Sequence, residues 1–301
     1  MLRHLSAAAL LLAQFLALAA PASAEPVAAD CATLTAALDT FVGYDLTVPP
    51  AGPQDGWCVL DGAALRADGP GRPDLTADRL RLRGMVDASA LVGIDVDLSG
   101  LRVAFKAGDD SVDDRVRGLF RLQSAELRFV AGVDGATQSV DLRGGFLRLS
   151  SGTEVTFAGT AQAAGLSGPA LLAGRLTGLQ LGWRNDGRLL RPVMELVGGR
   201  LDPGLSGTAA VDATRLALRQ MVEGLPAAAL TEDSAPELEQ WVAALPQGRG
   251  RLAVSLVAPN GIGAAQLLLA GLRDDPLGSK ALAQLLSGAQ ITATWTPGIG
   301  P

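Results

Sequence analysis

The chain has 301 residues and a formal net charge of −6, and Lys106 and Lys280 are its only lysines among 25 cationic residues. An acidic chain without a cationic cluster lacks the surface that holds phosphate backbones, which excludes nucleic acid as a partner. The only histidine is His4. Histidine-based nucleophile, metal and acid–base sites are therefore excluded from the rest of the chain.

Residues 1–24 have the pattern of a cleavable export signal. Arg3 and His4 form a short positive segment, 14 largely apolar residues follow at 7–20, and Ala22-Ser23-Ala24 is a small-x-small cleavage site. A retained membrane anchor is the alternative, but the run is shorter than the ~20 residues that a spanning helix needs. We expect a soluble chain of 277 residues with a net charge of −7 and no membrane span. Its bias to arginine, alanine and glycine suggests a bacterial origin and hence a periplasm.

Cys31 and Cys58 are the only cysteines. In an oxidising compartment such a pair most simply forms a disulfide, which contributes about 3 kcal/mol in the chain-entropy description. A redox-active pair is the alternative, although the spacing is not Cys-x-x-Cys. Apolar residues at helical spacing predict a helix over 29–41, and Val59-Leu60 begins the first predicted strand. The disulfide would then staple an N-terminal helix to the edge of a sheet.

Five Leu-polar-apolar triplets recur through the middle of the chain. Each places two apolar side chains on one side of a strand and a polar one on the other, as half-buried strands do. Turn-type pairs such as Ser99-Gly100, Asp134-Gly135 and Ser151-Gly152 punctuate the segment. The triplets are Leu80-Arg81-Leu82, Leu101-Arg102-Val103, Leu127-Arg128-Phe129, Leu147-Arg148-Leu149 and Leu179-Gln180-Leu181.

The spacing of the triplets leaves room for return strands, which we predict at residues 94–98, 119–122 and 155–158. Residues 60–195 would then form a curved antiparallel meander with one apolar face, which a helix, a second sheet or a lipid must cover. An open β-groove and a sandwich both fit, because both bury alternate residues. The predicted class is α+β and mainly β.

After residue 205 the apolar period becomes helical. Val211, Leu218 and Val222 share one helical face, and Ser234 with Glu237 forms a capping box ahead of a second helix. We also predict a strand over 251–257 that turns at Asn260-Gly261 and pairs with residues 264–269 as a hairpin. A helix over 276–286 and a last strand, with Ile291, Ala293 and Trp295 on one face, would follow. This C-terminal helical cap completes a division into segments 1–24, 25–58, 59–205 and 206–301.

Two groups of carboxylates are the remaining candidates for chemistry. Four aspartates crowd residues 109–114, but they lack the spaced ligands of calcium loops, so a solvated turn is favoured over a Ca²⁺ site. Asp95 and Asp97 lie on the side of a strand opposite Ile94 and Val96. A glycosidase needs such a pair in a cleft, whereas alternation predicts a polar outer face. We predict no enzyme activity, no metal and no cofactor.

The apolar side chains of the triplets are the main candidate for function. Covered by the C-terminal helices they are ordinary core, whereas in an open trough they line a groove for acyl chains. The residues concerned are Leu80, Leu82, Leu101, Val103, Leu127, Phe129, Leu147, Leu149, Leu179, Leu181 and Trp183.

The export signal, the Leu-polar-apolar strands with Asp-Gly and Ser-Gly turns, and Asp78-Arg79-Leu80-Arg81-Leu82 resemble the AsmA-like class of bacterial envelope proteins. That class has repeating β-groove structures and is associated with phospholipid transport and outer-membrane homeostasis. The resemblance implies a periplasmic protein that binds a lipid or another apolar ligand. A scaffold that binds an envelope protein through its sheet edges or helices is the alternative. A hydrolase using carboxylates alone is a third hypothesis.

Overall fold

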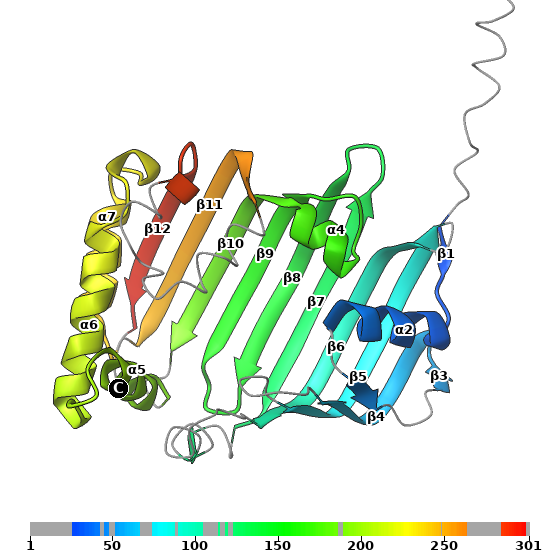
Figure 1. Cartoon of the computed structure of the whole chain (residues 1–301), viewed down its shortest axis with the longest axis horizontal. Coiled ribbons are helices and arrows are strands. Elements are labelled where there is room, and N and C mark those ends of the chain that lie inside the picture. Colours follow the sequence, from blue (N-terminus) through cyan, green and yellow to red (C-terminus); the bar gives the residue numbers. More distant parts are fainter. Residues whose placement is uncertain are drawn as a thin grey trace, which may run out of the picture.

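The computed structural model is built around one open antiparallel sheet, which runs across the whole molecule (Figure 1). From β4 to β12 each strand pairs with the next one in the chain, so the predicted meander is confirmed and the fold is mainly β. All strands of the described part belong to this single sheet rather than to a sandwich. The structure describes residues 26–42, 45–47, 52–66, 74–87, 90–104, 114, 118–119, 123–185, 189–247, 249–263 and 284–298.

Twelve strands are described. They are β1 (Val27–Ala28), β2 (Asp45–Thr47), β3 (Gly52–Gln54), β4 (Trp57–Arg66), β5 (Asp74–Asp87), β6 (Ala90–Ala104), β7 (Ala125–Asp134), β8 (Ser139–Leu149), β9 (Glu154–Gln162), β10 (Arg175–Asn185), β11 (Gly250–Gly263) and β12 (Gln290–Pro297). The helices named below are α2 (Cys31–Val42), α4 (Gly168–Ala173), α5 (Leu190–Leu201), α6 (Gly207–Glu223), the short 3₁₀ helix η1 (Ala227–Ala229) and α7 (Ser234–Ala244).

The five triplets all lie in strands, but the strands are longer than we predicted. Residues 94–98 and 101–103 belong to the same 15-residue strand β6, so no separate return strand lies between them. The Ser99-Gly100 pair is a bulge rather than a turn, with Gly100 at φ 66°. This left-handed conformation suits glycine, and the extra residue keeps Leu98 and Leu101 on the same face.

Two further expectations about strands were wrong. We predicted a return strand at 119–122, but residue 119 is helical, and 120–122 lie outside the described residues. Asn260-Gly261 lies within β11, whose antiparallel partner on that side is β12 rather than a hairpin strand at 264–269. That segment, like 276–283, lies outside the described residues. Residues 155–158 do form a return strand, β9.

The N-terminal helix α2 lies across the first strands of the sheet, as predicted (Figure 1). The disulfide between Cys31 and Cys58 joins it to β4, with 5.2 Å between the two Cα atoms. Asp30 caps the helix, because its Oδ1 accepts a hydrogen bond from the backbone N–H of Thr33 at 2.7 Å. That hydrogen bond lowers the pKa of Asp30 below its ordinary value of 3.8.

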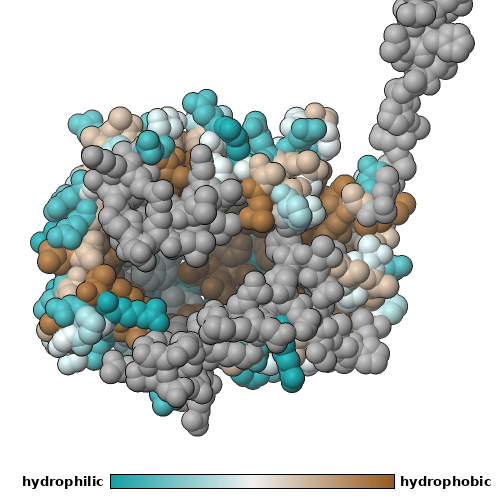
Figure 2. Space-filling model, in the orientation of Figure 1, coloured by the Kyte–Doolittle hydropathy of each residue, from teal (hydrophilic) through white to brown (hydrophobic). Residues whose placement is uncertain are grey.

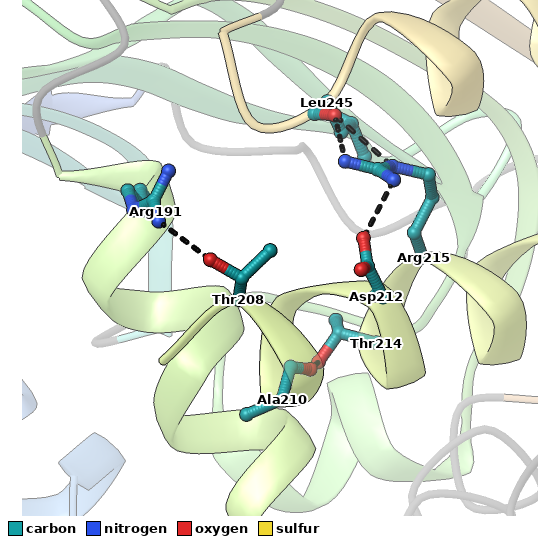
Figure 3. A network of polar contacts seen from close by, with 7 residues as sticks. All are labelled: Arg191, Thr208, Ala210, Asp212, Thr214, Arg215 and Leu245. Carbon is teal, nitrogen blue, oxygen red and sulfur yellow. Dashed lines mark hydrogen bonds and ion pairs between the residues drawn. The ribbon is translucent and has the colours of Figure 1, made fainter. Parts of the chain in front are cut away.

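Three helices, α5 to α7, stand at the opposite end of the sheet beside β12 (Figure 1). We predicted α6 and α7, whereas α5 occupies a segment that we assigned partly to the meander. Arg215 of α6 donates two hydrogen bonds to the carbonyl oxygen of Leu245, at 3.1 and 2.8 Å, and pairs with Asp212 (Figure 3). The Thr214 hydroxyl donates to the carbonyl oxygen of Met194 in α5. These contacts tie the three helices into one unit.

Residues 1–24, which carry the predicted export signal, lie outside the described part of the chain. Among the described helices, none is both long enough and apolar enough to cross a membrane.

Candidate functional site: an apolar sheet face with an open centre

One row of apolar side chains crosses nine consecutive strands on the same face of the sheet. Directly paired residues of antiparallel strands point to the same side, so the register defines the row without ambiguity. Its members, from β4 to β12, are Leu60, Leu80, Leu98, Leu127, Leu147, Val155, Trp183, Leu252 and Trp295. At the usual strand spacing this row is about 38 Å long.

The first end of the row is a closed core. Leu60 is fully buried, and Leu80 and Leu98 are 4% and 8% exposed. Leu34 of α2 packs into the same cluster as these residues, together with Leu82. The disulfide therefore holds a helix over β4 to β6, which is the cover that an apolar sheet face requires.

The other end of the row is closed by the C-terminal helices. Leu252 and Trp295 are each 7% exposed and share a cluster with Val242 of α7. The Trp183 ring meets the Trp241 ring of α7 edge to face, with 5.4 Å between centroids. The sheet thus has a second, separate core at β10 to β12.

The centre of the row is less well covered than either end. Leu127, Leu147, Val155 and Trp183 are only half-buried. We call the following residues of β8 to β10 the open stripe, because they share this face and none packs against a described core cluster: Leu147, Leu149, Val155, Phe157, Leu179 and Leu181. Figure 2 shows a hollow in the middle of this face, with hydrophobic residues visible on its floor.

Two features shape the open stripe. The Phe157 ring lies against Gly145 of the neighbouring strand, where a Cβ atom would collide with it. Leu181 is 38% exposed, although its cross-strand partners Phe157 and Val254 are both apolar. An exposed leucine with apolar neighbours forms part of an exposed apolar patch, and such patches are typical of binding surfaces.

The structure divides the predicted groove residues among four environments. Leu80 and Leu82 are core, and Leu101, Leu127 and Phe129 pack against that core from its edge. Trp183 packs against the C-terminal core. Leu147, Leu149, Leu179 and Leu181 belong to the open stripe, and Val103 is half-buried outside every described cluster. We did not single out Val155 and Phe157, although both fall in a predicted return strand.

The β12 edge of the sheet is closed by side chains of α7, which corrects the predicted capping box. Ser234 is fully buried, and its Oγ accepts a hydrogen bond from the Ala293 N–H at 2.9 Å. The Glu237 carboxylate accepts one from the Trp295 N–H at 2.6 Å. Both side chains thus accept hydrogen bonds from the sheet instead of capping their own helix. They satisfy the outward N–H groups that an edge strand leaves unpaired.

The opposite face of the sheet carries ion pairs over β4 to β6. Arg83 pairs with Asp95 at 2.8 Å and Arg81 with Asp97, and both guanidinium groups lie over the Trp57 ring. Both aspartates therefore lie on the face opposite the apolar row, as alternation predicted, but Asp95 is only 7% exposed and its Oδ1 has no hydrogen-bond partner among the described residues.

Charges at the margin of the same face are paired as well. A hydrogen bond from Arg102 lowers the pKa of Asp78, and the same contact raises the pKa of Arg102. Within the described ranges no three His, Cys, Asp or Glu side chains gather as a metal site would require. The acidic segment 109–114 lies outside those ranges, except for Asp114.

Comparison with models of known protein families and with the sequences of curated proteins gives no match for this chain.

Proposed function

We propose that this protein binds a lipid or another ligand with an acyl chain on the open stripe, as a non-enzymatic component of the bacterial periplasm. The observation that carries the proposal is the change in burial along one continuous apolar row. Leu60 and Trp295 are sealed at its ends, whereas Leu147 and Val155 are half-buried at its centre. An exposed apolar patch within a concave surface is typical of ligand-binding grooves.

The position of the stripe favours an acyl chain over a peptide. β8, β9 and β10 are each paired with a strand on both sides, so their backbone donors and acceptors are used within the sheet. A peptide in the groove would bury its own polar backbone without these partners, which costs free energy for every unpaired group. An acyl chain has no such groups, and each buried methylene contributes about 0.8 kcal/mol.

A scaffold acting through sheet edges is less favoured. Residues of α7 already bond the outward N–H groups of Ala293 and Trp295 on β12. The other side of the sheet ends in β1, β2 and β3, which are only two or three residues long. Short or covered edge strands are poor templates for an added strand. The AsmA-like relationship remains a prediction, and its groove-based lipid binding agrees with the proposal.

Titration with a fluorescent fatty acid, together with mass spectrometry of lipids that copurify with the protein, tests the proposal. Leu181→Asp puts a charge into the stripe and should weaken fatty-acid binding at least about tenfold, equivalent to about 1.4 kcal/mol. Val257→Asp is the matched control, because Val257 is 51% exposed on the opposite face of the adjacent strand. A wild-type protein that carries no lipid and binds no fatty acid would refute the proposal, as would equal affinity in the two variants.

A further inference from the structure

The polar face of the sheet contains a second recess, on the side opposite the open stripe. It spans β8 to β12 and has a volume of about 520 Å³. Strand alternation places its small residues, Ala158, Gly182 and Ala253, on this face, where they form the floor. The neighbouring lining residues are neutral and polar, namely Thr156, Gln180, Ser255, Thr292 and Thr294. The volume lies in the range of small-ligand sites.

Gly182 allows two polar groups to converge at the floor. A Cβ atom at this position would collide with the Thr156 hydroxyl and would lie 3.6 Å from Nη2 of Arg251. Because Gly182 has no side chain, the Thr156 hydroxyl and the Arg251 guanidinium group can both lie over β10 at this point. Arg251 comes from β11 and Thr156 from β9, on the two sides of Gly182.

Arg251 has no anionic partner within the described structure. Its cross-strand neighbour is another cation, Arg184, which lies 3.6 Å from Glu154. Arg148 contacts the same carboxylate at 2.9 Å and reaches Glu126 at 3.7 Å. Arg148 and Arg184 thus share two glutamates at this corner, and Arg251 contacts neither of them. On β5 and β6, by contrast, Arg81, Arg83 and Arg102 each have an aspartate partner.

The neutral polar groups of the recess are also unused. None of the side chains of Thr156, Gln180, Ser255, Thr292 and Thr294 makes a hydrogen bond with another described residue. Hydroxyl and amide groups both donate and accept, so together they can serve a ligand that carries many hydroxyl groups. Phe146 adds an aromatic wall beside them.

We propose that this recess binds an acidic saccharide, a sugar chain whose carboxylate pairs with Arg251 while its hydroxyl groups bond the threonine, serine and glutamine side chains. Arginine matches carboxylate geometry through its planar fork of donors. A free phosphate fits less well, because a single unpaired cation among neutral groups provides few of the charged donors that a phosphate engages. The side chains that would hold the saccharide lie on the opposite face from the open stripe, and two stripe residues, Phe157 and Leu181, also border the recess.

NMR titration of the full chain with tetragalacturonate tests the proposal. We expect backbone amide shifts on β9 to β12, binding at least about tenfold weaker for the methyl-esterified tetrasaccharide, and no comparable shifts with acetate. Arg251→Gln should reduce affinity to the level of the ester. Ala253→Phe should abolish binding by filling the recess without a change in charge. Arg102→Gln, on the same face but outside the recess, is the control and should bind like the wild type.

Several outcomes would overturn the proposal. Absence of binding by the folded wild-type protein would exclude an acidic saccharide as the ligand. Equal shifts with acetate would leave a general anion site instead of a sugar site. Equal affinity of the Arg251 and Arg102 variants would remove Arg251 from recognition. The amide spectrum of each variant reports in the same experiment whether it is folded.

Discussion

The ends and the centre of the apolar row are made of the same kinds of residue but differ in what covers them. Leu60 and Leu147 lie in one row on one face, yet the first is fully buried beneath α2 and the second is half-buried. Their side chains are chemically identical, so the difference arises from the covering helices. Burial in this protein is therefore decided by tertiary packing, and none of the described helices packs onto the centre.

The largest expected effect comes from truncating the row at its covered end. Leu60→Ala removes a fully buried side chain and should lower the free energy of unfolding by about 3 to 5 kcal/mol, through lost burial and a new cavity. Leu147→Ala should cost about 1 kcal/mol, because its side chain is already partly in water. Urea unfolding of both variants measures the difference. Equal losses would show that the centre is as tightly packed as the end.

Removing the cover should make the first end resemble the centre. The joint replacement Cys31→Ser and Cys58→Ser opens a cross-link between residues 27 apart and should cost about 3 kcal/mol. It should also increase the binding of a dye that reports exposed apolar surface. Reduction of the wild-type protein should reproduce both effects and leave the double variant unchanged. Unchanged stability in the variant would show that α2 holds its place without the disulfide.

The C-terminal end depends on hydrogen bonds from α7 to the edge of the sheet. Ser234→Ala leaves the Ala293 N–H without its buried acceptor and should cost about 1 to 3 kcal/mol. Glu237→Ala should also destabilise the protein, whereas Glu237→Gln keeps an acceptor for the Trp295 N–H and should restore most of the loss. Thermal unfolding of the three variants tests this. A Gln variant as unstable as the Ala variant would mean that the charge, and not the acceptor, matters.

The smallest effect concerns the cap of α2 and its dependence on pH. The folded-state pKa of Asp30 lies below 3.8, so the unfolded chain binds its proton at higher pH than the folded one. The stabilisation by this carboxylate is complete above pH 3.8 and is lost as the pH falls through the lower, folded value. Asp30→Asn keeps a good capping residue and removes the titration. Unfolding measurements should therefore show a shallower acid dependence in this variant, and an unchanged slope would exclude the cap as its source.

Much of the sheet could be predicted from residue alternation, and the exceptions have identifiable physical causes. The five triplets are strands because the two-residue period is a local property. Ser99-Gly100 has the composition of a turn, but a glycine with positive φ serves a bulge equally well when the flanking residues stay paired. Ser234 and Glu237 match a capping box, and only the tertiary position of β12 redirects them to the sheet.

The candidate site shows the same limit. The alternating pattern placed Leu80 and Leu147 on one apolar face, as the register confirms. The alternating pattern could not show which of these residues are buried core and which are exposed, because burial depends on where α2 and α7 pack. The recess around Arg251 left no signal, since its defining feature is an arginine without a partner, and pairing across strands requires the register.

Photolabelling with a fatty acid that carries a diazirine group tests the central claim most directly. Peptide mass spectrometry should locate the crosslinks on β8, β9 and β10, at Leu147, Phe157 or Leu181, and Leu181→Asp should remove them while Val257→Asp leaves them in place. Crosslinks confined to the opposite face or to the covered ends of the row, or labelling unaffected by Leu181→Asp, would contradict the account.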